Sequence, residues 1–507
     1  MLIVGAGPTG LVLALWLTRF GVRVRIIDKL AASGTTSRAL AVQARTLEYY
    51  QQMGLAQAVV DRGHRIPALN LWVRHNQAAR IPLENLGQGL TPFPFPIIFP
   101  QDEHETLLID RLREVGVEIE RVAELVAFED SGGEVRATIR KGGALDTAAY
   151  AYLAGCDGAR SRVREVLGTG FPGGTYDHLF YVADVEAAGP PMNGELHVDL
   201  DDADFLAVFP LSDGGRARLI GSVRDAVAKD HEHLRIEDVQ GRAVQNLRVE
   251  IRSVNWFSTY RVHHRVAQQF RKGRAFLLGD AAHIHSPVGG QGMNTGIGDA
   301  VNLAWKLAAA LKDSGSAALL DSYEIERIAF ARRLVATTDQ AFTAVISDSA
   351  WARFVRTKVV PALAPGLFRM AAIRRFMFRT VSQTAVHYRD SPLSEGSTGT
   401  LRGGDRLPWV RTAGDDAFNF AALTAMNWQL HVYGLPALEL QALSDRRRIP
   451  LHAFAWLPGM KQAGLRRNAV YLVRPDGYIA LADASGRGAA ISAYLDKNKI
   501  QPASENQ

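Results

Sequence analysis

The stretch that decides the fold is LIVGAGPTGLVLALWLTRFGVRVRIID, residues 2–28. Its pattern predicts a short strand, a glycine-rich turn at Gly5–Gly10, a helix through Phe20 and a second strand at Val22–Ile27 that ends at Asp28. Strand, glycine turn, helix, strand and acid follow one another in this order in dinucleotide-binding units. The segment therefore indicates an α/β fold of the Rossmann type.

The glycines of this turn have separate roles in such a unit. Gly5 allows the tight turn, Gly7 lets the backbone approach a pyrophosphate, and Gly10 lets the helix pack closely on the strand. The helix that follows offers free N–H groups and the positive end of its dipole to phosphates. Asp28, about 20 residues further on, can accept hydrogen bonds from an adenosine ribose. We therefore expect a dinucleotide site here.

A second glycine-rich segment lies far downstream. RAFLLGDAAH, residues 274–283, predicts a buried strand that delivers Gly279 and Asp280 to its carboxyl end, where ligands of open α/β sheets bind. PVGGQGMNTG, residues 287–296, follows, and after it we expect a helix running through Lys306. Three glycines within four residues disfavour regular structure unless the backbone approaches a flat or phosphorylated group. The start of this helix favours negative charge.

A third segment lies between these two. YLAGCDGARSRVR, residues 152–164, predicts a strand that leads into Cys156-Asp157-Gly158 and an arginine-rich turn. From its residues alone, a structural role is as well supported as a functional one.

The three segments, in this order and spacing, resemble those of the single-component flavoprotein aromatic hydroxylases, the para-hydroxybenzoate hydroxylase family. They match its GxGxxG turn, its DG motif, which the family links to FAD and NADPH handling, and its GD motif. The resemblance covers nearly the whole chain and is closest to members with an extra C-terminal domain, such as phenol, polyketide and rifamycin hydroxylases. Further matches are Ser37–Ala39, Arg45–Glu48, Pro100–Gln101, Asp299, Asn302–Leu303, Leu320–Glu324, Glu326–Arg327, Tyr388 and Ser391–Leu393.

The resemblance implies non-covalent FAD and assigns residues to it. Arg38 and Gln101 resemble contacts to the ribityl–pyrophosphate region, and Asp280 resembles the residue at the ribityl–phosphate end. Leu125 resembles a backbone contact near the adenine, and Gly292–Asn294 should lie along the pyrimidine edge of the flavin. The expected cofactor-binding set is Gly5, Gly7, Pro8, Thr9, Gly10, Asp28, Lys29, Arg38, Gln101, Leu125, Asp157, Gly279, Asp280, Pro287, Gly290, Gly292, Met293 and Asn294.

The resemblance also implies the reaction. NADPH or NADH reduces the FAD, a flavin C4a-hydroperoxide forms with O2, and its distal oxygen attacks an aromatic substrate that is phenolic or polyketide-like. One dinucleotide fingerprint is visible, so the nicotinamide cofactor is expected to dock transiently. No residue can be assigned as the substrate-activating base, and the catalytic residues stay unassigned.

Other functions are open at this point. Baeyer–Villiger oxygenation uses the same fold, and a flavin-binding sensor would need no catalytic residues. A flavin-dependent halogenase is disfavoured, because Trp256 is followed by Phe257-Ser258 and not by the Trp-x-Trp-x-Ile-Pro pattern.

The resemblance implies an α/β fold of two interleaved domains followed by a third. A Rossmann-type FAD-binding domain is joined to a sheet-rich substrate domain and a C-terminal thioredoxin-like domain. The third domain cannot perform thiol chemistry, because the single cysteine is Cys156. The expected boundaries are 1–70, 98–175 and 270–395 for the FAD domain, 71–97 and 176–269 for the substrate domain, and 396–507 for the third.

Some aromatic and histidine residues allow two interpretations. Trp256–Phe257 and Phe205–Phe209 could line an aromatic pocket, but core packing is at least as well supported. His283 and His285 are expected to be structural. Met370–Phe378 alternates aromatic residues and arginines, which predicts an amphipathic helix in an ordinary packing role rather than on a membrane surface.

The composition excludes several classes of protein. The 507 residues are 47% hydrophobic and 22% charged, which argues against disorder. One cysteine excludes an intramolecular disulfide framework and iron–sulfur sites, and no metal site is expected. The net charge of +6 comes from scattered arginines, so no nucleic-acid partner is expected. The apolar run Leu11–Leu17 is too short to span a membrane, which favours a cytoplasmic protein with no membrane partner; homodimerisation is left open.

Overall fold

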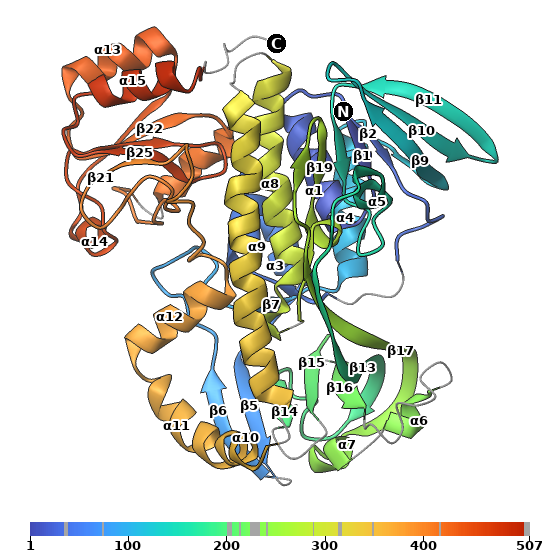
Figure 1. Cartoon of the computed structure of the whole chain (residues 1–507). Helices are drawn as coiled ribbons and strands as arrows, with labels where there is room; N and C mark the ends of the chain where they lie inside the picture. The colour runs from blue at the N-terminus through green and yellow to red at the C-terminus, as the bar shows by residue number, and fades with distance from the viewer. Residues whose placement is uncertain are drawn as a thin grey trace.

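Two long helices form the spine of the molecule. The computed structural model describes residues 1–34, 39–73, 76–199, 205–211, 214–223, 234–239, 242–286, 288–312, 317–346, 349–414 and 417–500. Helix α8 (Gly292–Leu311) lies beside α9 (Ala317–Ile346), with the amino-terminal unit on one side and the carboxyl-terminal unit on the other (Figure 1). Within the described residues, every helix is too short or too polar to cross a membrane.

The amino-terminal unit is built on a six-stranded sheet in the order β18-β19-β12-β1-β2-β8. The strands from β19 to β8 are parallel, so the residues that follow β1, β12 and β19 emerge at one edge. The three segments singled out in the sequence therefore meet there. Helix α1 (Pro8–Arg19) packs against α8 and α4 (Gln101–Glu114). The strands are β1 (Leu2–Val4), β2 (Arg25–Ile27), β8 (Ile119–Glu120), β12 (Leu153–Gly155), β18 (Arg271–Lys272) and β19 (Ala275–Leu277).

Two small sheets and three helices complete this unit. The first sheet pairs β9 (Ala123–Asp130), β10 (Val135–Lys141) and β11 (Ala144–Tyr150), and the second pairs β3 (Ala41–Val42), β7 (Ile97–Ile98) and β4 (His64–Arg65). The helices are α2 (Ala44–Gln52), α3 (Ala56–Arg62) and α5 (Arg162–Leu167).

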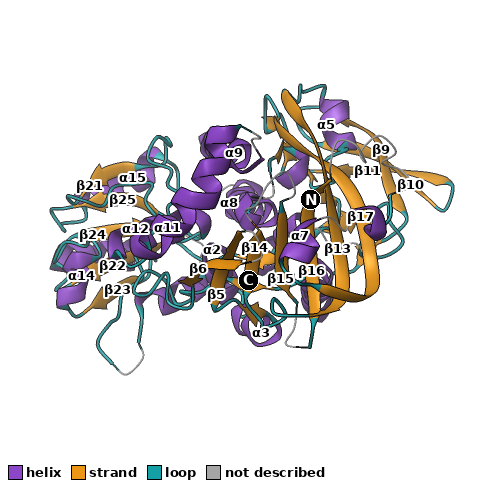
Figure 2. Cartoon of the chain, turned by 90° about the horizontal axis from the view of Figure 1, so that it is seen from below, coloured by secondary structure: helices purple, strands orange, loops and turns teal. Residues whose placement is uncertain are grey.

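An eight-stranded sheet, in the order β20-β17-β13-β16-β15-β14-β5-β6, lies at the lower end of the molecule in Figure 1 and toward the viewer in Figure 2, which looks from below. One of its faces is covered by α6 (Ile236–Val239) and α7 (Arg242–Asn246), whose apolar side chains join those of Ala183, Val185 and Leu219 in one core. The other face is left for the cavity described below. The strands are β5 (Ala68–Val73), β6 (Asn76–Pro82), β13 (Gly173–Ala188), β14 (Leu196–Asp199), β15 (Leu206–Pro210), β16 (Arg216–Val223), β17 (Glu250–Val266) and β20 (His283–Ile284).

Three short helices follow α9 and arch beside β5 and β6 (Figure 1). They are α10 (Ala350–Phe354), α11 (Val360–Leu367) and α12 (Ala371–Val381), and one π-helical turn joins the first two. The amphipathic pattern of Met370–Phe378 falls largely on α12: Phe378 is buried, and Phe376 is 67% exposed.

The carboxyl-terminal unit holds a five-stranded sheet in the order β21-β25-β24-β22-β23. Strands β22 and β23 are parallel and joined through α13, and β24 and β25 form an antiparallel hairpin. Helices α13 and α15 cover one face (Figure 1). The elements are β21 (Glu395–Ser397), β22 (Gln429–Tyr433), α13 (Leu438–Arg447), β23 (Leu451–Phe454), α14 (Pro458–Gln462), β24 (Val470–Val473), β25 (Ile479–Asp483) and α15 (Ala489–Lys497).

Helix α8 begins earlier than the sequence predicts. It starts at Gly292, although its glycines led us to expect a loop as far as Gly296. A Cβ at Gly296 would lie 2.3 Å from Thr9 Oγ1, so this glycine allows α8 to pack closely on α1. Tertiary packing therefore overrides the low helix propensity of glycine.

Candidate active site

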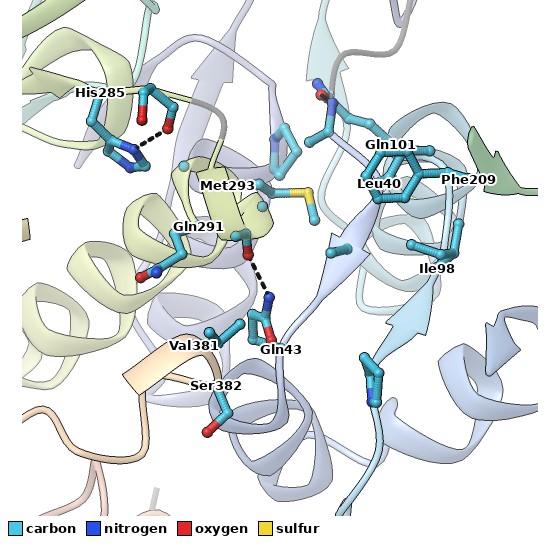
Figure 3. Close-up of a pocket in the computed structure, with 18 of the residues that line it drawn as sticks. Leu40, Gln43, Ile98, Gln101, Phe209, His285, Gln291, Met293, Val381 and Ser382 are labelled. Atoms are coloured by element: carbon cyan, nitrogen blue, oxygen red, sulfur yellow. Dashed lines mark hydrogen bonds between the residues drawn. The ribbon is translucent and has the colours of Figure 1, made fainter. Parts of the chain in front are cut away.

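A cavity of about 660 Å³ opens at the carboxyl edge of the six-stranded sheet. Figure 3 shows Gln291 and Met293 at the start of α8, with Leu40 and Phe209 on the other side of the cavity. Its walls include the two glycine-rich segments, the eight-stranded sheet, the small sheet of β3 and β7, and helices α11–α12 with the residue just after each. The eight-stranded sheet contributes Leu69, Leu196, Phe209 and Ile220, and the helical wall contributes Phe368, Met377, Phe378, Val381 and Ser382.

The start of α1 is packed on one side and open on the other. A Cβ at Gly5 would meet the carbonyl oxygen of Cys156 at 2.3 Å, and one at Gly10 would meet that of Gly5 at 2.0 Å. Gly7 caps the helix without a side chain, and no described protein atom lies within 4 Å of where its Cβ would be. Gly7 lines the cavity. The uncapped N–H groups and the helix dipole thus favour a phosphate at this place, which fits the pyrophosphate of FAD.

The start of α8 has the same character. The side chain of its N-cap residue, Gln291, accepts no hydrogen bond from the helix, and its first turn carries no acid. Gly289 and Gly290 adopt φ values of 77° and 61°, which glycine tolerates without strain. A Cβ at Gly292 would meet only the His285 ring, at 3.9 Å. The helix start therefore has room for a flat group and a potential that favours negative charge.

Asn294 and Gln43 hold this turn in place. The Asn294 carboxamide accepts the Gln43 N–H at 2.9 Å and donates to the carbonyls of Ala41 and Gly290, each at 2.8 Å. The Gln43 side chain donates to the carbonyl of Gly289 at 2.8 Å (Figure 3). The carboxamide of Asn294 is thus engaged within the protein and does not line the cavity, whereas Gly292 and Met293 beside it do.

The three candidate acids lie in different surroundings. Asp28 accepts the N–H groups of Ala6 (2.7 Å) and Leu30 (2.8 Å), which fixes it at the end of β2. Asp157 accepts from Ser161 Oγ at 2.5 Å and from the N–H of Val163 at 3.1 Å, and burial raises its pKa. Asp280 is exposed and is the one of the three that lines the cavity.

The other predicted residues divide between the cavity and its surroundings. Gln101 lines the cavity and donates its amide to Glu105 at 2.8 Å, whereas Leu125 is buried in β9 opposite Ile139. Arg38 and Pro287 lie outside the described residues. The cavity is lined by Gly7, Pro8, Thr9, Gln101, Asp280, Gly290, Gly292 and Met293, and Gly5, Gly10, Asp28, Lys29, Leu125, Asp157, Gly279 and Asn294 lie outside its lining.

The two histidines of the GD segment differ. His283 Nε2 lies 2.8 Å from Asp299, whose carboxylate also accepts the N–H of Gly279 at 2.9 Å, so His283 helps to hold the GD turn. His285 lines the cavity, and its Nδ1 donates to the carbonyl of Ser286 at 2.8 Å. Burial lowers the pKa of His285 to about 4, so its imidazole is neutral at pH 7.

The aromatic candidates also divide. Phe209 lines the cavity, but Phe205 packs beside Phe180 and Val262. Phe257 stacks on Tyr181, with ring centroids 6.1 Å apart, and belongs to the core under α6 and α7. The sequence motifs missed Gln43 and the helical wall, and no local pattern marks these residues as neighbours of the glycine turns.

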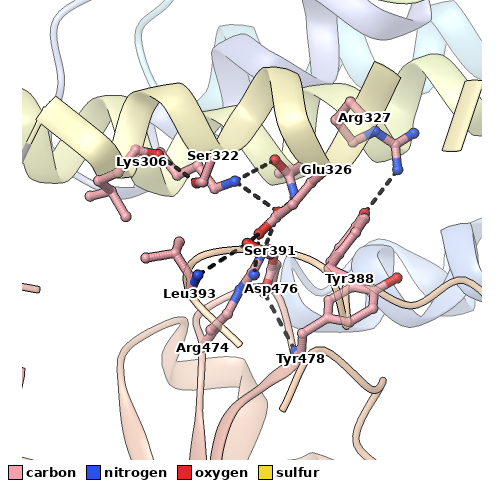
Figure 4. A network of polar contacts seen from close by, with 12 residues as sticks. Lys306, Ser322, Glu326, Arg327, Tyr388, Ser391, Leu393, Arg474, Asp476 and Tyr478 are labelled. Carbon is pink, nitrogen blue, oxygen red and sulfur yellow. Dashed lines mark hydrogen bonds and ion pairs between the residues drawn. The ribbon is translucent and has the colours of Figure 1, made fainter. Parts of the chain in front are cut away.

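A second polar cluster lies deep between the spine and the carboxyl-terminal unit (Figure 4). Glu326 accepts hydrogen bonds from Lys306 (2.8 Å), Ser391 (2.7 Å) and Arg474 (2.8 Å). Arg474 also binds Asp476, which accepts from the indole of Trp305. Neighbouring Arg474 and Lys306 lower the pKa of Glu326 although its burial opposes this, and burial lowers the pKa of Lys306 to about 8. No residue of this cluster lines the cavity.

Within the described part of the chain, no three or more His, Cys, Asp or Glu side chains gather as metal ligands would.

Comparisons with known proteins show the family to which the chain belongs. A family described as "FAD binding domain" matches residues 1–338. The chain is 37% identical to 6-methylpretetramide 4-monooxygenase of Streptomyces rimosus over 99% of this chain and 94% of that protein. It is 30% identical to anhydrotetracycline monooxygenase of the same organism over 96% of each. The solved structure of anhydrotetracycline hydroxylase from Streptomyces rimosus superposes with a TM-score of 0.80, at 29% identity and 99% coverage of both chains. The chain therefore belongs to the family of FAD-binding class A aromatic hydroxylases and is a flavin-dependent aromatic monooxygenase.

Proposed function

We propose that this monooxygenase hydroxylates a polycyclic phenolic substrate of the polyketide type at the expense of NADPH or NADH. One observation carries the proposal: a single cavity joins both open helix starts to the apolar wall of the eight-stranded sheet. A flavin at the helix starts and an aromatic substrate against the sheet would share this chamber. The relatives that act on tetracycline precursors support the polycyclic class.

FAD, when bound, supplies the hydride acceptance and the oxygen transfer to the ring. We propose that it is held non-covalently, with the start of α1 at its pyrophosphate, Asp28 near its adenosine ribose and Asp280 at its ribityl end. Gly292 and Met293 at the start of α8 would then lie along its ring. The open space at Gly7 and Gly292 supports this placement.

The protein's own part is to exclude water, orient the substrate and set the local charge. Leu69, Phe209 and Ile220 form an apolar wall against which a planar ring can lie. The dipole of α8 stabilises negative charge that develops near Gly292. Because His285 is neutral and its Nδ1 donates to Ser286, it contributes no positive charge there.

We also propose the division into domains. The six-stranded sheet with its helices would form the FAD domain, and the eight-stranded sheet the substrate domain. The order β23-β22-β24-β25, with a helix between β22 and β23 and another after β25, supports a thioredoxin-like third domain. Arg474 of this domain donates to buried Glu326 of α9, which supports a role of the domain in stabilising the fold rather than in thiol chemistry.

The test is flavin reduction with a panel of simple phenols and polycyclic aromatic compounds. A polycyclic phenol should accelerate reduction of the bound flavin by NADPH or NADH at least about tenfold, which corresponds to about 1.4 kcal/mol of barrier. The product should gain one oxygen with its rings intact. A rate of flavin reduction that none of the compounds changes would contradict the proposal. A ring-expanded product would show Baeyer–Villiger oxygenation instead.

The cofactor assignment has its own test. Acid precipitation should release all the flavin, and Asp280→Ala should retain less FAD after gel filtration than the wild type. Asp102→Ala, on the first turn of α4, is the matched carboxylate control and should retain it. Flavin that stays with the precipitate, or equal retention in both variants, would count against the assignment.

A further inference from the structure

The outer surface of α10–α12 exposes an unusual number of large apolar side chains. Eight of the sixteen exposed large hydrophobic residues among those described lie in this one segment. Trp351 is 73% exposed, and its ring stacks on that of Phe354, which is also exposed. We call this the arch surface; its exposed apolar residues are Trp351, Phe354, Val360, Leu363, Leu367, Met370, Phe376 and Met377.

The same segment carries charge of one sign. Residues 349–382 contain seven Lys and Arg residues and no Asp or Glu. Arg374 donates to the carbonyls of Phe368 and Arg369, so one of these cations also ties α12 to the end of α11. Lys358, Arg369 and Arg375 are exposed. The arch surface is therefore both apolar and cationic.

This combination argues against a second copy of the chain as the partner. A two-fold interface would place the same patch against itself, and the exposed cations Lys358, Arg369 and Arg375 would meet a patch of the same charge. Apolar and aromatic side chains interspersed with Lys and Arg on short helices are instead typical of segments that lie in the interface of a bilayer. Anionic lipid headgroups would neutralise the cations while the rings enter the acyl boundary.

We propose that the arch surface docks this protein on membrane surfaces that contain anionic lipid. The inner side of the same helices lines the cavity through Phe368, Phe378 and Val381. Docking thus brings one wall of the cavity to the bilayer, in which apolar aromatic compounds dissolve. This last consequence rests on the proposed function, whereas docking itself does not.

The experiment is co-sedimentation of the FAD-loaded full chain with vesicles, in the absence of substrate. Vesicles of phosphatidylcholine with one quarter phosphatidylglycerol should bind the protein at 0.1 M salt, and vesicles of phosphatidylcholine alone should not. Lys358→Glu/Arg369→Glu/Arg375→Glu should weaken binding at least about 30-fold, since each basic residue near an anionic surface contributes about a factor of five. Arg446→Glu/Arg467→Glu/Arg487→Glu makes the same charge change at exposed sites of the carboxyl-terminal unit and should weaken binding less than about threefold.

A second pair separates apolar insertion from charge. Trp351→Ser/Phe376→Ser should weaken binding at least about tenfold, whereas Leu435→Ser/Leu438→Ser, at residues that are 75% and 88% exposed, should not. Flavin content and turnover of a water-soluble phenol should be unchanged in all four variants.

Three outcomes would overturn the proposal: no binding to anionic vesicles, equal binding to neutral vesicles, or equal loss in the arch and control variants. So would a dimer in sedimentation velocity that Trp351→Ser/Phe376→Ser dissociates, because the arch surface would then be an interface between copies.

Discussion

Helix α8 passes through two environments, which differ in whether the polar groups there are paired within the protein. At its start, Gly292 lines the cavity, and among the described residues no side chain caps the helix. Three turns later, Asn302 and Lys306 donate to Glu326 in a cluster whose charges are paired within the protein. Open donors beside a cavity indicate a ligand, and paired buried charges indicate structure.

The comparison shows why a shifted pKa is a poor guide here. Perturbed titratable groups often mark functional sites, and Lys306, with its pKa lowered to about 8, would be selected on that ground. Yet Lys306 is fully buried, bonded to Asn302 and Glu326, and remote from the lining of the cavity. The cluster joins α8 and α9 to the carboxyl-terminal unit, and its role is cohesion.

The largest effect is expected from breaking the paired cluster. Glu326→Gln removes the charge that compensates buried Arg474 and Lys306, and should lower the free energy of unfolding by about 3–5 kcal/mol. Denaturant unfolding followed by fluorescence measures it. Glu395→Gln, which removes an exposed ion pair with Lys497, should cost less than about 1 kcal/mol. Similar losses in the two variants would remove the distinction between paired cluster and surface.

A second prediction concerns pH and a buried histidine. His104 is fully buried, its Nε2 shares a hydrogen bond with the Tyr50 hydroxyl at 2.5 Å, and burial lowers its pKa to about 3. As pH falls below 6.5, the unfolded chain binds a proton at this histidine before the folded chain does, so stability is lost between pH 6.5 and 3. The loss should reach about 2 kcal/mol at pH 5.

His104→Phe tests this assignment. It should reduce the difference in unfolding free energy between pH 7.5 and pH 5 by about that 2 kcal/mol, whatever its effect at pH 7.5. An undiminished pH dependence would mean that other buried groups cause the acid sensitivity.

The smallest effect is expected at Gly7, at the uncapped start of α1 beside the cavity. Gly7→Ala should leave the stability of the flavin-free protein unchanged, because its φ of −79° suits alanine and its Cβ meets no protein atom. It should weaken FAD binding about tenfold, or about 1.4 kcal/mol, because the Cβ projects toward the pyrophosphate. Flavin fluorescence titration measures the affinity.

Gly10→Ala is the matched control, since its Cβ would stand 2.0 Å from the carbonyl oxygen of Gly5. It should destabilise the flavin-free protein by about 1–3 kcal/mol. If Gly7→Ala binds FAD as the wild type does, the start of α1 is not the phosphate site.

Much of the fold followed from local sequence. The strand and helix around the first glycine turn appear as β1 and α1, and the strands predicted before Cys156 and Gly279 appear as β12 and β19. Boundaries were less well predicted: β2 covers only Arg25–Ile27, and α8 begins at Gly292. Both depend on neighbours that a local pattern does not contain.

The sequence by itself determined that three glycine-bearing turns follow strands, because a tight turn and its flanking strand are encoded within about ten consecutive residues. Their meeting at one edge followed from the parallel order of an α/β sheet. Only the tertiary structure decided that Gln43 would brace the Gly289 turn, that Phe368 and Phe378 would close the cavity, and that Arg474 would pair with Glu326. These contacts join residues that are distant in the chain, so they depend on how helices and sheets pack and leave no mark in any local stretch. The exposure of the arch surface also depends on the tertiary structure, because the packing of neighbouring elements determines which side of an amphipathic helix stays in contact with solvent.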